Sequence, residues 1–439
     1  MIESLASIAS ASASVISRRK FVASGVELLW GLCARRMPEV YVPTQEIIDT
    51  SCLPPNSWLG NNGVWKLFGI DTVIDQLIAR KLPLGKVTIM CGDTGTGPSP
   101  HVGIDLRCEE PINGFDDYID GIGHGTLGAG LCLDFNPAPK YGQTRRAALT
   151  LIDVQNNLMH PDRKELSDAT DNNPHAALLY IALSRLGALA DERIKAFLDA
   201  GGTVVCAAGN GGHVVPGESE TALSDSDDSV ITLPYVSSSV QEEPTYALWH
   251  PATLDGVIAA VSVDGLDLEG YLGTPDPTSS PGGAKPETCL AAPGRHLSST
   301  AKGGDKNKAG YYANIAEGIR GTSFAAPNLA AFFALLASIH LGDNPDITPR
   351  QAVQNVVNIA LQAKNCRHPG KFDTRYDDDV AFCALGVPQA DRILNDLGIK
   401  LYKIYAPLML TPKDRRDRSQ SQAITRALNT KISRRNRRA

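Results

Sequence analysis

Three short glycine-rich segments of the chain each carry one side chain able to do chemistry. Asp93 lies in GDTG, His124 in DGIGHGTLGAG and Ser323 in GTSFAAP. A serine hydroxyl is hardly ionised at neutral pH, so its attack on a carbonyl requires a base, and histidine suits that role with a pKa near ~6.5. A carboxylate holds the histidine tautomer and stabilises the imidazolium that forms. Together the three residue types indicate nucleophilic serine catalysis.

A fourth segment, VVCAAGNGG, ends an apolar run at Asn210. An asparagine amide can donate to the negative oxygen that develops when a carbonyl is attacked, and loss of such a donor typically lowers kcat about 10²–10³-fold. Ser323 adds a backbone N–H at the start of a predicted helix, where the helix dipole favours negative charge. Taken alone, the Asn-Gly pair favours an ordinary turn over an oxyanion donor.

Strands and helices alternate from residue 84 onward, which predicts an α/β protein with a parallel sheet covered on both faces. The uncharged run Phe324–Leu341 is long enough for a membrane span. Its many alanines, together with Pro327 and Asn328, favour a helix buried inside the domain. The predicted strands are Lys86–Cys91, Ala147–Val154, Gly202–Ala208 and Gly256–Val263, and the predicted helices are Asp71–Lys81, Asp191–Ala200 and Ala325–Leu341.

The four segments, in the order Asp, His, Asn, Ser, resemble the signatures of the subtilisin-like serine proteases, the subtilases of the peptidase S8 family. The stretches HPATLDGVIAAV, LAAPG and GVPQAD are also similar to that family. Within the nucleophile segment, Phe324 and Asn328 stand where the family usually has Met and His. The resemblance implies a three-layer subtilisin-like α/β fold with a mostly parallel central sheet and helices on both faces.

The resemblance also implies a serine endopeptidase that works through an acyl-enzyme. Ser323 would be the nucleophile, His124 the general base and then general acid, and Asp93 the residue that orients His124. Asn210 and the Ser323 backbone N–H would form the oxyanion hole. The rival hypothesis from another class is a catalytically silent binding module with the subtilase fold.

Residues that would form the substrate pocket are also suggested by the resemblance. One wall of this pocket would follow the apolar run Ala176–Leu183, which can be a strand or part of a helix that runs from His175. The first wall would contain Ser184, Leu186 and Gly187, and the second Ala207, Ala208 and Gly209.

Charge is unevenly distributed along the chain. The net charge is -6, yet residues 413–438 contain ten Lys/Arg and two Asp/Glu, a local +8 that leaves -14 for the rest. Such a tail is usually solvated, and docking to an anionic partner such as nucleic acid or a membrane surface is the alternative. The predicted organisation is an N-terminal extension at 1–56, a catalytic domain at 57–398 with an acidic, Ser-rich insertion at about 213–247, and a basic tail at 399–439.

The N-terminal extension leaves the location of the protein open. Arg18 and Arg19 precede an apolar run, which suggests a Tat-type export signal. Glu27 inside the run and the lack of an A-x-A-like cleavage site argue against it. A cytoplasmic location, a pro-segment and an organelle transit peptide are the alternatives. We expect a monomer without a transmembrane segment that acts on protein or peptide substrates.

No metal or other cofactor is required by this chemistry. The nine cysteines form no C-x-x-C pair, so a zinc knuckle is not supported, although Cys366 and Cys383 could pair in an oxidising compartment. Structural calcium is common among subtilases, but no compact loop of oxygen ligands is present, and calcium is left unassigned. The stretch GHGTLG also fits a dinucleotide fingerprint, but the polar residues before it argue against that interpretation.

Overall fold

A computed structural model describes 15 separate ranges of the 439-residue chain. The N-terminal extension up to residue 47, the basic tail after residue 401 and most of the predicted insertion lie outside them. The described residues are 48–49, 57–80, 82–96, 120, 122–135, 148–159, 166, 175–184, 186–211, 221–224, 230–232, 247–282, 285–301, 314–368 and 385–401.

A six-stranded parallel sheet lies at the centre of this part of the chain. Its apolar runs are buried almost throughout, which confirms the four predicted strands. The run whose interpretation was open is the strand β5, so the alternative of a helix from His175 is wrong. Across the sheet the order is β10 (Cys289–Arg295), β9 (Ile258–Asp264), β6 (Thr203–Ala207), β5 (Ala176–Ile181), β3 (Val87–Gly92) and β4 (Leu149–Asp153).

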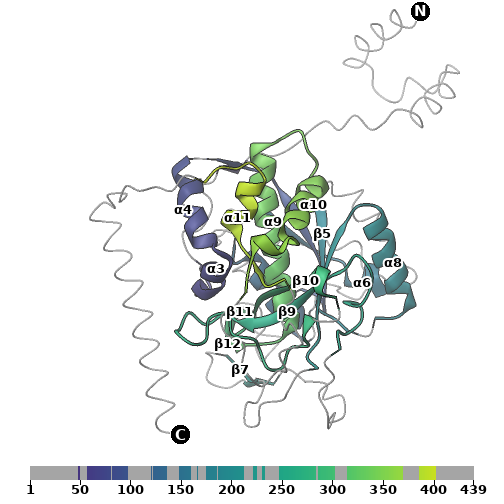
Figure 1. Cartoon of the computed structure of the whole chain (residues 1–439). Helices are drawn as coiled ribbons and strands as arrows, with labels where there is room; N and C mark the ends of the chain where they lie inside the picture. The colour runs from purple at the N-terminus through teal and green to yellow at the C-terminus, as the bar shows by residue number, and fades with distance from the viewer. Residues whose placement is uncertain are drawn as a thin grey trace, which may run out of the picture. The chain divides into compact units, whose positions relative to one another are not determined.

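Helices cover both faces of the sheet, as Figure 1 shows. This three-layer α/β arrangement confirms the predicted fold class. On one face lie α3 (Asn62–Phe68), α4 (Ile70–Arg80), α5 (His124–Leu133), α9 (Thr322–Asp343), α10 (Pro349–Ala360) and α11 (Ala390–Asp396), and on the other lie α6 (Gln155–Met159) and α8 (Ala188–Asp199).

The helix α9 is the core of the fold. It contacts every strand of the central sheet, and its side chains are buried on all sides from Phe324 to Leu341. A helix that is apolar all round is stable only when it is surrounded. Among the described helices α9 alone is long and apolar enough to cross a membrane, and its apolar window is wholly enclosed by protein. The predicted buried helix is therefore confirmed, with a start at Thr322.

The smaller sheets include strands from the predicted insertion and from the predicted N-terminal extension. Two short strands lie in the predicted insertion: β7 pairs with β8 on one side and with β12 on the other. The strand β1, from the predicted extension, pairs with β2. Their bounds are β1 (Ile48–Asp49), β2 (Pro83–Leu84), β7 (Thr221–Ser224), β8 (Val230–Thr232), β11 (Leu297–Ala301), β12 (Asn314–Ile319), β13 (Cys366–Arg367) and β14 (Val387–Pro388).

Strand order determines where a ligand site can form. The chain leaves β3 for β4 on one side and later returns to β5 on the other, so the order reverses at β3. In open parallel sheets, ligands bind beyond the carboxyl ends of the strands at such a reversal. Asp93 follows β3 directly.

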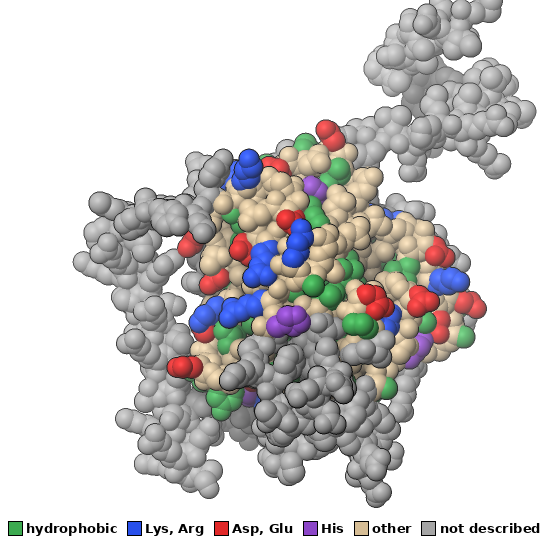
Figure 2. All heavy atoms as spheres, in the orientation of Figure 1, with side chains coloured by type: hydrophobic (Ala, Val, Ile, Leu, Met, Phe, Trp, Pro, Cys, Tyr) green, Lys and Arg blue, Asp and Glu red, His purple; other side chains and the backbone are tan. Residues whose placement is uncertain are grey.

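On the face seen in Figure 2, charged side chains of both signs are interspersed and apolar ones form only small groups.

Candidate active site

The candidate aspartate and histidine are in contact beyond the end of β3. Asp93 is 1% exposed, and its Oδ1 accepts hydrogen bonds from Nδ1 of His124 and from the Thr94 backbone N–H, each at 2.7 Å. His124 is the first residue of α5, and its side chain is 19% exposed. Because a carboxylate can only accept, the imidazole proton lies on Nδ1 and the lone pair on Nε2 is left for another donor.

Asp120 ties the loop that carries Asp93 to the start of α5. Its buried Oδ1 accepts from the Thr94 hydroxyl at 2.9 Å and the Gly123 N–H at 2.6 Å. Its Oδ2 accepts from the N–H and hydroxyl of Thr126 at 2.8 and 2.7 Å. A carboxylate there satisfies N–H groups that the helix leaves unpaired. Asp120 is absent from the predicted site, although an acidic residue before a helix is a known start signal.

Glycines on α5 allow these elements to approach closely. A Cβ on Gly125 would lie 1.8 Å from the Gly95 carbonyl oxygen, so the helix backbone touches the loop after β3. A Cβ on Gly128 would lie 2.8 Å from the Tyr180 hydroxyl oxygen and 3.2 Å from Oδ2 of Asp93. Both oxygens are buried, and neither forms a hydrogen bond of normal geometry with a described residue. Small residues at these positions are therefore a condition for the Asp93–His124 contact.

Ser323 is the second residue of α9 and lies beside the end of β5. Its Oγ donates to the Ala182 carbonyl oxygen at 3.3 Å, and the Ala182 N–H donates to the Gly92 carbonyl oxygen at 3.1 Å. No hydrogen bond joins the two described residues Ser323 and His124, although catalytic hydrogen bonds often form only with substrate bound. Phe324 packs on the His124 ring with centroids 5.0 Å apart. This departure from the family pattern therefore contacts the candidate base itself.

Asn210 lies beyond β6 and is bonded to the residue before Ser323. Its Oδ1 accepts from the backbone N–H and the hydroxyl of Thr322, both at 3.0 Å. The same hydroxyl accepts from the Gly209 N–H at 3.0 Å. With Oδ1 occupied, the amide is fixed and Nδ2 is the donor that remains. A side chain bonded to a helix 112 residues away does more than close a local turn. Thr322 is absent from the predicted site, and its hydroxyl beside Ser323 is the only sequence signal for it.

The first predicted pocket wall is arranged differently from the expectation. Ser184 is exposed beyond the end of β5, but Leu186 is buried in the core and Gly187 is the N-cap of α8. The structure brings Ala182, rather than Leu186 or Gly187, next to Ser323.

The second predicted wall lies beside Asn210. The backbone N–H groups of Ala208 and Gly209 donate inside the protein, to the Ala260 carbonyl and the Thr322 hydroxyl. Ala208 is buried and Ala207 partly exposed. Ala208 and Gly209 therefore offer a ligand no free backbone N–H.

The surroundings shift several pKa values. Burial lowers the pKa of His124, but the charge and hydrogen bond of Asp93 and the charge of Asp120 raise it, and the net shift is upward. The ring is therefore a stronger base than an exposed histidine. Behind it, burial raises the pKa of Cys91, Cys132 and Tyr180 well above their ordinary values, so these groups are neutral.

Neither a group of metal ligands nor a disulfide is present among the described residues. No three His, Cys, Asp or Glu side chains in these ranges group as metal ligands. The cysteines there are buried free thiols, and Cys366 donates to the Ala360 carbonyl oxygen at 3.2 Å. Cys383, its suggested partner, lies outside the described residues.

Comparison with known proteins identifies a family. A family model described as the subtilase family matches residues 109–377, a range that includes His124, Asn210 and Ser323 but begins after Asp93. No curated protein matches the chain. Among similar solved structures, the prenylagaramide maturation protease PagA has 17% identity over 71% of this chain and 94% of its own, with a TM-score of 0.46. The PatG macrocyclase in complex with peptide has 16% identity over 76% and 97%, with a TM-score of 0.47.

Replacing Gly128 with Ala should destabilise the protein, because the new Cβ would lie 2.8 Å from the Tyr180 hydroxyl oxygen. Strain of this kind typically costs roughly 1–3 kcal/mol. Tyr180→Phe should be nearly neutral alone and should recover much of the loss in the double variant, since it removes the clashing oxygen. Urea unfolding of the four proteins measures this coupling. Equal losses with and without the hydroxyl would contradict the predicted clash.

Asp153, at the end of β4, should make stability depend on pH. Burial raises its pKa to about 7, although the carboxylate accepts the Gln155 N–H at 3.0 Å. Between about pH 4 and 7 the folded protein keeps this proton while the unfolded chain releases it. Stability due to Asp153 therefore falls as pH rises through this window, by up to about 1.4 kcal/mol per unit.

Asp153→Asn cannot titrate, so its stability relative to the wild type should increase as pH rises from 4 to 8. Denaturant unfolding at several pH values measures the difference. The matched control is Asp255→Asn, which removes the same charge at an exposed position. A difference between Asp153→Asn and the wild type that stays constant with pH would show that the group does not titrate in this window.

Proposed function

Because the chain belongs to the subtilase family, we propose that it is a serine endopeptidase that cleaves peptide bonds through an acyl-enzyme. Ser323 is the nucleophile, His124 the general base, Asp93 its orienting carboxylate and Asn210 the oxyanion donor. The observation that carries the proposal is the 2.7 Å contact between the buried Asp93 carboxylate and Nδ1 of His124. This contact leaves Nε2 as the free basic atom, as the reaction requires.

The first half of the reaction moves one proton from Ser323 to the leaving amine, forms the bond from Ser323 Oγ to the carbonyl carbon and breaks the peptide C–N bond. Ser323 Oγ leaves the Ala182 carbonyl oxygen, gives its proton to Nε2 of His124 and attacks the peptide carbonyl carbon. The negative charge that develops on the carbonyl oxygen is stabilised by Nδ2 of Asn210 and the Ser323 backbone N–H. His124 then gives the proton to the leaving amine, and the acyl group stays on Ser323.

The second half repeats these steps with water. His124 takes a proton from water, and the hydroxide attacks the acyl carbon. The ester bond to Ser323 then breaks, the new carboxylic acid leaves, and His124 returns the proton to Ser323 Oγ. Asp93 keeps its charge throughout and stabilises each imidazolium. Every proton and electron pair comes from the protein, the peptide and water. The residues that line the site near Ala182 and Ala207 determine which substrate sizes and sequences the enzyme accepts.

Ser323→Ala should abolish peptide hydrolysis and labelling by a fluorophosphonate probe. The loss expected for a serine nucleophile is about 10⁴–10⁶-fold in kcat. The fold should be retained, because Ser323 Oγ makes a single weak hydrogen bond at 3.3 Å. Thr253→Ala, a change at an exposed hydroxyl residue that is not part of the candidate site, is the control and should label normally. A folded wild type that neither labels nor cleaves would instead favour the silent binding module.

Asp93→Asn should change the pH profile of kcat/KM as well as its height. Burial alone lowers the pKa of His124, and Asp93 is the main group that raises it. The base must be neutral to accept a proton, so in the wild type activity is lost as pH falls through the raised pKa. In the variant the acidic limb should move to lower pH, while the plateau falls by about 10⁴-fold. An unmoved limb would show that Asp93 does not set this pKa.

A further inference from the structure

Lys285 places its ammonium group against three backbone carbonyl oxygens of a single loop. Its Nζ donates to Leu254 at 2.5 Å, Val257 at 3.4 Å and Ala252 at 3.5 Å. The lysine precedes the short 3₁₀ helix Pro286–Thr288 that leads into β10. An ammonium has three donors, and here each finds one acceptor.

The three carbonyl groups make a positive charge favourable at this point of the loop. The carbonyls of Ala252 and Val257 have no other donor among the described residues, and that of Leu254 has only the Val257 N–H. Carbonyl dipoles that converge repel one another, and a buried acceptor without a partner costs about 1–3 kcal/mol. Backbone carbonyls that converge in this way are also the ligands that proteins use for potassium ions.

The same loop supports the second candidate pocket wall. The Trp249 N–H donates to the Ala208 carbonyl oxygen at 2.8 Å, and the Trp249 ring lies where a Cβ on Gly209 would be, 2.4 Å from its Cγ. Gly209 directly precedes Asn210. The Ala252 N–H donates to the Trp249 carbonyl oxygen at 2.9 Å, so Trp249 links residues 252–257 to the segment before Asn210.

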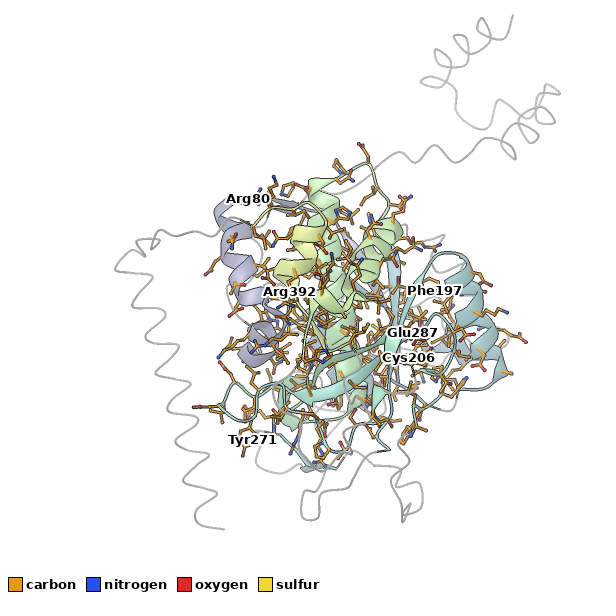
Figure 3. All side chains as sticks on the ribbon, viewed as in Figure 1. Arg80, Phe197, Cys206, Tyr271, Glu287 and Arg392 are labelled. Atoms are coloured by element: carbon orange, nitrogen blue, oxygen red, sulfur yellow. The ribbon has the colours of Figure 1, made fainter. Side chains whose placement is uncertain are left out.

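The charge of Lys285 also acts on two thiols of the central sheet. Burial raises the pKa of the Cys206 thiol on β6 and that of Cys289 on β10, and the charge of Lys285 lowers both. Figure 3 labels Cys206 and Glu287, two residues after Lys285, in this region.

We propose that the Lys285 ammonium is a built-in cation, which fills a cradle that would otherwise take a monovalent ion of similar size. The protein then needs no bound ion to order this loop. Removal of the side chain should convert the cradle of Ala252, Leu254 and Val257 into a binding site for K⁺ or NH₄⁺.

Two substitutions distinguish a cation site from simple loss of packing. Lys285→Ala removes the charge and opens the cradle, whereas Lys285→Met removes the charge but keeps an apolar chain of similar length in the space. Lys195→Ala, on the exposed face of α8, controls for the loss of one positive charge. Full-length proteins are purified in KCl and exchanged into KCl, NH₄Cl or choline chloride at equal ionic strength.

Thermal unfolding measures the melting temperature of each protein in each salt. The wild type and Lys195→Ala should melt at the same temperature in all three salts. Lys285→Ala should melt on the order of 5 °C lower in choline chloride and regain stability, in a saturable way, as K⁺ or NH₄⁺ is added. Lys285→Met should be destabilised and should not be rescued.

Three outcomes would overturn the proposal. They are a Lys285→Ala protein as stable as the wild type in choline chloride, equal effects of K⁺ on all four proteins, and failure of Lys285→Ala to fold in KCl while Lys285→Met folds. Folding of Lys285→Ala in KCl with unfolding in choline chloride would support the proposal in its strongest form.

Discussion

The hydrogen bond between the buried Asp93 carboxylate and Nδ1 of His124 is the contact on which the other features of the site depend. It requires that the end of β3 and the first turn of α5 meet at 2.7 Å, although 31 residues separate the two side chains in sequence. A carboxylate held in a nearly dry environment is costly unless hydrogen bonds and a partner charge offset its desolvation. The Thr94 N–H and the imidazole supply that compensation on Oδ1.

Several residues that do not react are needed for this hydrogen bond to form. Asp120 fixes the helix start against the loop, and Gly125 removes the side chain that would separate them. On the other side, α9 brings Ser323 to the end of β5 because its apolar body can be buried only across the middle of the sheet. The site is thus formed where two buried helices begin near adjacent strand ends.

The sequence predicted the architecture well because strands such as Lys86–Cys91 and the helix at Ala325–Leu341 differ clearly in length and composition. It did not predict α5, since HGTLGAGLCL contains three glycines that ordinarily disfavour a helix. The structure supplies the reason, which is that other backbone and side-chain atoms occupy the space beside them. The cradle of Lys285 could not have been predicted either, because its acceptors are backbone carbonyls that every residue possesses.

The most direct test of the proposed chemistry is detection of the acyl-enzyme. The wild type is mixed with an activated peptide ester, quenched in acid and digested, and the peptides are analysed by mass spectrometry. An acyl group on the peptide that carries Ser323, formed before steady state and lost again by hydrolysis, is the predicted result. Hydrolysis of the ester without any adduct, or with an adduct on a residue other than Ser323, would contradict the proposed role of this serine.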